Sequence, residues 1–239
     1  MLLSGVRAVV FDAVGTLIFP DPPAHVIYAQ VGSRHSSQLD ADSIRPRFAM
    51  AFQAQEEIDR RQGWRTSEER EKVRWRQIVA SVLTDVIDPD ACFHALFDHF
   101  SKPEAWRCDP SASSILRDFA RKGLMLGLAS NYDSRLRSVL AGKPDLAAIQ
   151  IVCISSEIGW RKPSPKFFEA VSHSAGIPPE NIVFVGDDFE NDVEGALRAG
   201  MRHVWLKPDN PPLIPNSAPD NEVPRIGRLK DLLPLMNQP

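Results

Sequence analysis

Five short apolar runs, each ending at a small or polar residue, most strongly limit how this chain can fold. They cover residues 6–11, 124–129, 149–154, 182–185 and 203–206. Their length and their content of β-branched residues predict buried strands. Segments with helical spacing lie between the later runs and connect to them closely. This alternation predicts an α/β fold, a doubly wound parallel sheet with helices on both faces.

The predicted helices of this part have recognisable ends. Ser111 is expected to cap one helix, and Ser164, which precedes a proline, is expected to cap the next. A third helix follows Asp187 and closes at Gly200. The Pro-, Asn- and Asp-rich stretch from 208 to 224 is predicted to be irregular surface chain.

Residues 21–109 follow a different pattern, with amphipathic helical stripes and no convincing strand. Thr66 and Glu69 are spaced as a capping box in front of a helix that carries Trp75. We therefore predict two parts: an α/β core domain of residues 1–20 and 110–239, and an inserted all-helical cap subdomain of residues 21–109. The basic stretch of residues 60–76 is interleaved with glutamates and is interpreted as a solvated helix face.

Composition narrows the classes of partner and compartment. The chain has 239 residues, 43% of them hydrophobic and 25% charged, and a formal net charge of −3. Such a balance gives no general attraction to nucleic acid or to an anionic membrane. No run approaches the ~18 apolar residues of a membrane span, and we expect no signal peptide. Three widely spaced cysteines suggest a reducing compartment, so we expect a cytoplasmic protein. It is expected to be a monomer or a homodimer.

Polar residues follow the predicted strands at the points where they end. Asp12 follows the first run, Ser130 and Asn131 follow the second, and Asp187 follows the fourth, while Lys162 precedes a helix after the third. In an open parallel sheet these ends line one edge, where ligands bind. One such aspartate often only caps a helix, but the whole set predicts a functional site.

Four segments resemble the motifs of the haloacid dehalogenase-like hydrolases, in the family's order. Residues 9–17 (VVFDAVGTL) resemble the first motif, usually D-x-D-G-T-L, and residues 129–131 resemble the second. Residues 159–165 resemble the third, with Lys162, and residues 185–192 resemble the acidic fourth. The resemblance implies a Rossmann-like core. It also implies that the insertion between the first two motifs is the C1-type helical cap of subfamily I.

The resemblance implies a phosphoryl-transfer role for the first motif. Asp12 would attack phosphorus and form an aspartyl-phosphate, which splits one difficult displacement into two easier ones. Mg²⁺ would be the cofactor, held by the carboxylates of Asp12 and Asp187 and by the backbone carbonyl of Val14. The expected substrate is a small phosphorylated metabolite.

The other motifs imply supporting roles. Lys162 would keep Asp12 ionised and offset the charge that develops on the phosphoryl group. Ser130 and the backbone amide of Asn131 would donate to a phosphate oxygen. Three further residues are expected to support the site without binding substrate: Thr16, Asp188 and Asp192.

One departure from the family pattern leaves the reaction open. Val14 stands where phosphatases of this family carry a second aspartate, which protonates the leaving group. The protein is therefore interpreted as a phosphohydrolase limited to good leaving groups, such as acyl or aryl phosphates. The alternatives are a metal-independent 2-haloacid dehalogenase and a low-activity binding or regulatory protein. Phosphonate cleavage would need a Schiff-base lysine in the insertion. It is disfavoured, because the insertion offers only Lys72 and Lys102, and Lys72 lies in a charged run.

Side chains of the insertion are candidates for contact with the substrate. These candidates are Trp64, Arg65, Arg74 and Arg76, because an arginine can pair with a second anionic group. The simpler expectation is stronger: Trp75 and its neighbours belong to a core, and the arginines lie on the surface.

Overall fold

A six-stranded parallel sheet forms the centre of the computed structural model, which describes residues 4–207 and 223–237. Every neighbouring pair of its strands is parallel. In spatial order the strands are β5 (Ile151–Ile154), β4 (Met125–Ser130), β1 (Ala8–Phe11), β6 (Ile182–Gly186), β7 (Arg202–Leu206) and β8 (Arg225–Ile226). The five predicted strands are confirmed. The short β8 was not predicted, because two residues carry no periodicity.

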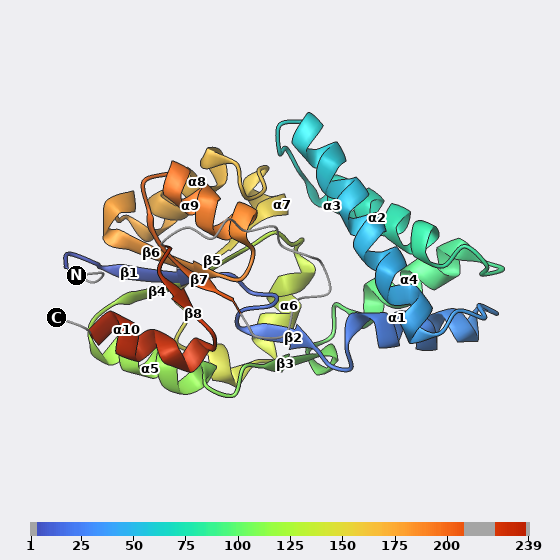
Figure 1. Cartoon of the computed structure of the whole chain (residues 1–239), viewed down its shortest axis with the longest axis horizontal. Helices are drawn as coiled ribbons and strands as arrows, with labels where there is room; N and C mark the ends of the chain where they lie inside the picture. The colour runs from blue at the N-terminus through green and yellow to red at the C-terminus, as the bar shows by residue number, and fades with distance from the viewer. Residues whose placement is uncertain (1–3, 208–222, 238–239) are drawn as a thin grey trace.

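Helices cover both faces of the sheet, as predicted for a doubly wound fold (Figure 1). One face packs against α5 (Ala112–Arg121), α6 (Arg135–Ala141) and α10 (Leu232–Asn237). The other packs against α7 (Ser155–Ile158), α8 (Pro165–Ala175) and α9 (Gly195–Arg198). Alternate residues of β1 supply the two cores, since Val9 and Phe11 face the first group while Ala8 and Val10 face the second.

Five short helical turns lie among the described residues. Four are 3₁₀ turns: η1 (Pro103–Ala105), η2 (Pro144–Leu146), η3 (Pro179–Asn181) and η5 (Leu229–Asp231). The fifth, η4 (Phe189–Glu194), is a π-helical turn that runs directly into α9. The predicted helix after Asp187 therefore exists, but its first part is wound more loosely than an α-helix. π-turns are rare and often lie at functional sites.

Two predicted helix caps lack the side-chain hydrogen bond expected of them. Ser111 and Ser164 occupy the N-cap positions of α5 and α8, but neither hydroxyl accepts a capping hydrogen bond. The Ser111 hydroxyl instead donates to Asp109 Oδ1, and this oxygen also accepts from the Ser111 backbone amide at 2.8 Å. The Asp109 carboxylate therefore organises the turn into α5.

Four helices form the insertion and surround an apolar core of their own. They are α1 (Ala24–Arg34), α2 (Ala41–Arg61), α3 (Glu68–Val82) and α4 (Pro89–His99). Their shared core includes Phe48, Ile78 and Val79, and Trp75 packs against it as expected. The insertion lies on the side of the sheet toward which β1 runs (Figure 1). Among the described residues, no helix is long and apolar enough to cross a membrane.

A small antiparallel sheet joins the core to the insertion. It consists of β2 (Ile18–Pro20) and β3 (Trp106–Cys108), with Ile18 opposite Cys108. The expectation of no strand within residues 21–109 is wrong at β3. Three residues carry no visible alternation, and their pairing depends on a partner almost ninety positions earlier in the chain.

The predicted capping box of α3 is also wrong. Ser67 is the N-cap, and its hydroxyl accepts from the Arg70 amide at 3.2 Å. The Thr66 hydroxyl instead donates to Glu71 Oε1 at 2.8 Å. Residues 208–222, most of the predicted irregular segment, lie outside the described residues.

Candidate active site

The ends of three adjacent strands bring the candidate residues together. In the registers of β1 with its neighbours, Phe11 lies opposite Val185 of β6 and Leu128 of β4. Asp12 follows directly and its amide donates to the Val185 carbonyl at 2.8 Å. Asp187, one residue beyond β6, therefore lies beside Asp12, as strand ends in a parallel sheet require.

Three carboxylates meet at this edge. One oxygen from each of Asp12, Asp187 and Asp192 lies within 4.8 Å of the other two. Two glycines permit this approach. A Cβ on Gly15, whose φ is +94°, would lie 2.4 Å from Asp187 Oδ2, and one on Gly186 would lie 2.1 Å from Asp192 Oδ2. Any side chain at these positions would displace a carboxylate.

Lys162 is buried among these carboxylates, with 2% of its surface exposed. Its ammonium group donates to Asp12 Oδ1 and to Asp192 Oδ1, each at 2.6 Å. Burial alone would lower the pKa of Lys162, but the charges of Asp12 and Asp192 outweigh it and raise that pKa. The lysine is therefore a fixed positive charge that contacts the candidate nucleophile directly.

Asn131 holds the backbone of Lys162 from the neighbouring strand end. Its Oδ1 accepts from the Lys162 amide at 2.8 Å, and its Nδ2 donates to the Lys162 carbonyl at 3.0 Å. Sequence reasoning assigned Asn131 only a backbone contact with phosphate, so this use of its side chain was missed. Ser130 is buried at the end of β4, and its contact with phosphate stays a prediction.

One lysine does not balance the acidic residues gathered here. Burial, followed by the charges of Asp12 and other carboxylates, raises the pKa of Asp187 well above its usual value. Burial also raises the pKa of Asp192 to about 7, although Lys162 opposes this shift. The pKa of Asp188 is raised, chiefly by burial. The site therefore needs protons or a cation to hold its charge.

The donor set fits a hard cation. Carboxylate oxygens are the ligands that Mg²⁺ prefers, and few protein carboxylates suffice because the ion keeps several waters. Asp12 and Asp187, two of the three predicted ligands, lie within the cluster of carboxylates. Val14 is half-buried in the turn between β1 and β2, where it forms a bridge with Ile18. Its carbonyl as a third ligand stays a prediction.

The residues expected to support the site all contact it. The Thr16 hydroxyl donates to Asp187 Oδ1 at 3.1 Å. The Asp188 amide donates to Asp192 Oδ2 at 3.0 Å, while the Asp188 carboxylate caps η4. Trp205, on β7, adds a contact that the sequence did not reveal, since its indole nitrogen donates to the Asp187 carbonyl at 3.1 Å.

The candidate side chains of the insertion are already engaged. Arg74 is 1% exposed and pairs with Glu56 and Asp59, so the expectation of a surface arginine is wrong there. The Arg65 guanidinium lies over the Trp160 ring, 4.9 Å from its centre. Arg76 pairs with exposed Asp90 at 2.9 Å. Arg74 and Arg76 are thus paired with carboxylates of the insertion, while contact of Trp64 or Arg65 with the substrate stays a prediction.

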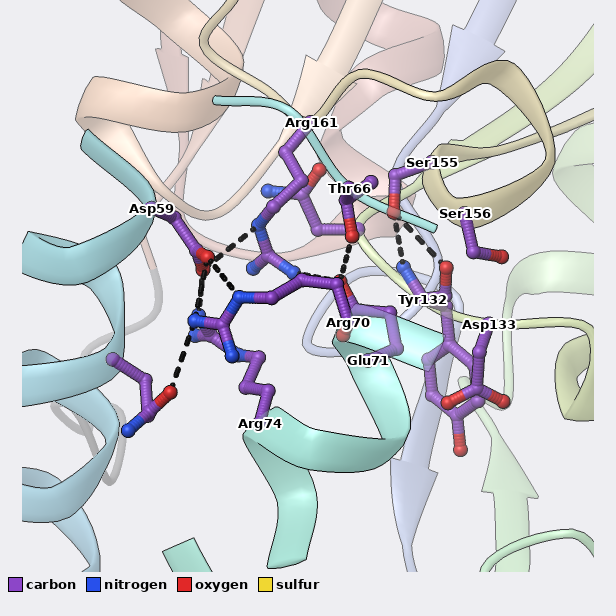
Figure 2. Close-up of polar contacts among 12 residues, drawn as sticks. Asp59, Thr66, Arg70, Glu71, Arg74, Tyr132, Asp133, Ser155, Ser156 and Arg161 are labelled. Atoms are coloured by element: carbon purple, nitrogen blue, oxygen red, sulfur yellow. Dashed lines mark hydrogen bonds and ion pairs between the residues drawn. The ribbon is translucent and has the colours of Figure 1, made fainter. Parts of the chain in front are cut away.

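Residues 60–76 are not simply a solvated helix face, because several of their side chains belong to a buried ionic network (Figure 2). Arg70, Arg74 and Arg161 converge on Asp59. The sequence offered no signal for this network, since its members come from α2, α3 and the loop before Lys162. Helical spacing relates only residues three or four positions apart, so it cannot identify ion pairs between such distant residues.

Comparison with known proteins agrees with this architecture. A family model of haloacid dehalogenase-like hydrolases matches residues 6–200. Haloacid dehalogenase-like hydrolase domain-containing protein 3 of Bos taurus is 28% identical over 247 residues, covering 97% of this chain and 94% of that protein. Phosphoserine phosphatase of Thermus thermophilus is 36% identical over 124 residues, covering 52% of this chain and 49% of that protein.

A solved structure shows the same fold. The L-2-haloacid dehalogenase of Xanthobacter autotrophicus superposes with a TM-score of 0.73 at 18% identity, covering 96% of this chain and 98% of that one. The family model spans the four strands β1, β4, β5 and β6 and the acidic residues described above. The chain therefore belongs to the haloacid dehalogenase-like hydrolases.

Proposed function

We propose that this protein is a cytoplasmic, Mg²⁺-dependent phosphohydrolase that acts on a small phosphorylated metabolite. The observation that carries the proposal is the contact of Lys162 Nζ with both Asp12 and Asp192, next to Asp187. This arrangement supplies a nucleophile, a fixed cation and a set of oxygen ligands at one point. The partial likeness to a phosphoserine phosphatase supports the same reaction class.

Asp12 would perform the chemical step. A carboxylate oxygen of Asp12 attacks phosphorus while the bond from phosphorus to the leaving oxygen breaks, which gives an aspartyl-phosphate. Water then attacks phosphorus and releases inorganic phosphate and the restored carboxylate. Lys162, in contact with Asp12, compensates charge on the phosphoryl oxygens. When bound, Mg²⁺ would supply the positive charge that lets a phosphate dianion approach these carboxylates.

Val14 limits which substrates this site can use. Its side chain cannot protonate the leaving oxygen, and such proton transfer is worth about 10²–10⁴ in rate. Its absence raises the activation free energy by about 3–5 kcal/mol. Acyl and aryl phosphates release stable anions and avoid most of this cost. We therefore assign the activity to substrates with good leaving groups.

Dehalogenation is the second candidate, because a solved dehalogenase shares the fold. In that reaction Asp12 would displace halide from carbon, and no metal would be needed. The clustered carboxylates of Asp187 and Asp192 weigh against it, since they add negative charge near a substrate that is itself a carboxylate. A binding or regulatory role without turnover is the third candidate.

One set of assays separates these reactions. Acetyl phosphate and 4-nitrophenyl phosphate are incubated with the protein in Mg²⁺ or in EDTA, and 2-chloropropionate is assayed for halide release. We expect phosphate release that requires Mg²⁺ and no halide release. Halide release in EDTA would identify the dehalogenase, while a protein that binds Mg²⁺ and turns over nothing would identify the binding protein.

A further inference from the structure

The loop that precedes Lys162 pairs with the turn between α2 and α3. The Arg161 amide donates to the Trp64 carbonyl at 2.9 Å, and the Thr66 amide donates to the Gly159 carbonyl at 3.1 Å. These bonds form an antiparallel bridge between Arg65 and Trp160. The insertion is therefore attached by its main chain to the residue next to the catalytic lysine.

The turn that makes this attachment has a costly backbone conformation. Trp64 has a φ of +65°, in the left-handed region that favours glycine. Its amide donates to the Asp59 carbonyl at 2.8 Å and its carbonyl accepts from Arg161. Such conformations persist where surrounding contacts hold them, and they gather at functional sites.

The Arg161 side chain continues from this bridge into the insertion. It is 2% exposed, donates to Glu71, pairs with Glu56 Oε1 at 3.0 Å, and places Nε 3.5 Å from Asp59 Oδ2. Figure 2 shows it reaching Asp59 beside Arg70 and Arg74. Burial would lower the pKa of Arg161, but the surrounding carboxylates outweigh burial and raise it. Arg161 is thus a permanent charge contributed by the core.

The network balances only when the core arginine is counted. It contains three cations and three anions: Arg70, Arg74, Arg161, Glu56, Asp59 and Glu71. The insertion alone supplies two of the cations and all three anions. Without Arg161 it would keep one uncompensated buried negative charge, which is strongly unfavourable. Burial would raise the pKa of Glu71, yet Arg161 and Arg74 together lower it.

We infer that Arg161 is a positioning residue. It fixes the position of the helical insertion on the core and, in doing so, the position of Lys162. Asn131 fixes the Lys162 backbone from the core side. Arg161, one peptide bond away, ties it to α2 and α3. If the Arg161 guanidinium is removed, the insertion is no longer held in one position on the core. The distance from the Lys162 ammonium group to Asp12 then varies. The catalytic part of this inference rests on the proposed phosphohydrolase function.

Arg161→Met tests the inference, with Arg70→Met as the matched control. Arg70 carries the same charge in the same network, but its side-chain partners, Asp59 and Gln55, both belong to the insertion. Hydrogen exchange of the Thr66 and Arg161 amides reports the bridge, with amides of β1 and β6 as the internal reference. We expect at least about tenfold faster exchange at both bridge amides in Arg161→Met, and less than about twofold in Arg70→Met.

Steady-state kinetics with acetyl phosphate and Mg²⁺ report the catalytic effect. In Arg161→Met we expect kcat to fall at least about tenfold while KM changes less than about threefold, because Lys162 acts mainly in the transition state. Arg70→Met should keep both constants close to those of the unsubstituted protein. A merely structural role would change the two variants alike.

A third variant keeps the test decisive if Arg161→Met does not fold. Arg161→Met combined with Glu71→Gln restores the charge balance, and we expect it to fold with fast exchange and low kcat. Bridge amides that stay protected in this double variant would overturn the inference, as would equal exchange in Arg161→Met and Arg70→Met. If the unsubstituted protein hydrolyses neither phosphate ester nor acetyl phosphate, the proposed function fails, while exchange still decides whether Arg161 seats the insertion.

Discussion

At the scale of residues, two neighbours of Asp12 have opposite effects on its chemistry. Lys162 holds the carboxylate through a direct 2.6 Å contact and places a positive charge beside it. Val14, two positions along the turn, offers no proton to the group that leaves. Under the proposed function, the site would accept a phosphoryl group but would not protonate a strongly basic leaving oxygen.

Val14→Asp should restore that assistance. We expect kcat/KM for an alkyl phosphate such as glycerol 3-phosphate to rise at least about tenfold, because general acid catalysis contributes about 10²–10⁴. Acetyl phosphate should gain much less, since its leaving group needs no proton. The measurement is phosphate release at saturating Mg²⁺.

Val14→Asn is the control for this variant. It matches aspartate in size but cannot transfer a proton, so it should give no gain on either substrate. An equal gain from asparagine, or none from aspartate in a folded protein, would contradict the assigned defect.

At the scale of elements, α2 and α3 are held together by charge as well as by apolar contact. Arg74 lies between them, pairs with Glu56 and Asp59, and stacks its guanidinium 4.7 Å from the centre of the Phe52 ring. Desolvation lowers the pKa of Arg74, and Arg161 adds to this effect. Such a buried arginine stabilises only while its partners remain in place.

Arg74→Met should therefore destabilise the insertion strongly. We expect the free energy of unfolding to fall by about 3–5 kcal/mol, the cost of stranding buried carboxylates. Arg76→Met, two residues along the same helix, removes an exposed pair and should cost about 1 kcal/mol or less. Urea unfolding followed by circular dichroism measures both. Similar losses in the two variants would show that the buried network contributes no more than a surface pair.

At the scale of the whole molecule, the cluster of Asp12, Asp187 and Asp192 links stability to pH. In the folded protein the pKa of Asp187 is raised well above its usual value and that of Asp192 is raised to about 7. The folded state therefore binds more protons than the unfolded state once the pH exceeds the usual carboxyl pKa of about 4. Their contribution to stability is therefore present at low pH and is lost as pH rises through their folded pKa values. A cation that replaces those protons should stabilise most where the carboxylates are ionised.

We predict that Mg²⁺ raises the Tm more at pH 8 than at pH 5. Comparing the protein with and without Mg²⁺ at each pH cancels the contributions of histidines and of the ionic network. Differential scanning calorimetry in Mg²⁺ or EDTA makes the measurement. A Tm increase that is equal at both pH values, or larger at pH 5, would contradict binding at these carboxylates.

The sequence revealed the core of this molecule better than its interface with the insertion. Asp12, Lys162 and Asp187 could be placed together because the ends of parallel strands share one edge. The contacts of Arg161 could not, since its hydrogen-bond partners Glu71 and Glu56 lie 90 and 105 positions away. Strand β3 was missed for the same reason, because only tertiary pairing defines it. Hydrophobic periodicity predicts the type of an element and which of its faces is buried. It does not predict ion pairs between residues that are far apart in the sequence.

The formation of a phosphoryl bond on Asp12 tests the central claim most directly. The protein is mixed with acetyl phosphate and Mg²⁺, quenched in acid within one turnover, and digested with trypsin, which releases residues 8–34 as one peptide. Mass spectrometry should find one added phosphoryl group on Asp12 in this peptide, and Asp12→Asn should show neither the group nor phosphate release. Phosphate release without any phosphoryl group on that peptide, or full activity in Asp12→Asn, would contradict the account.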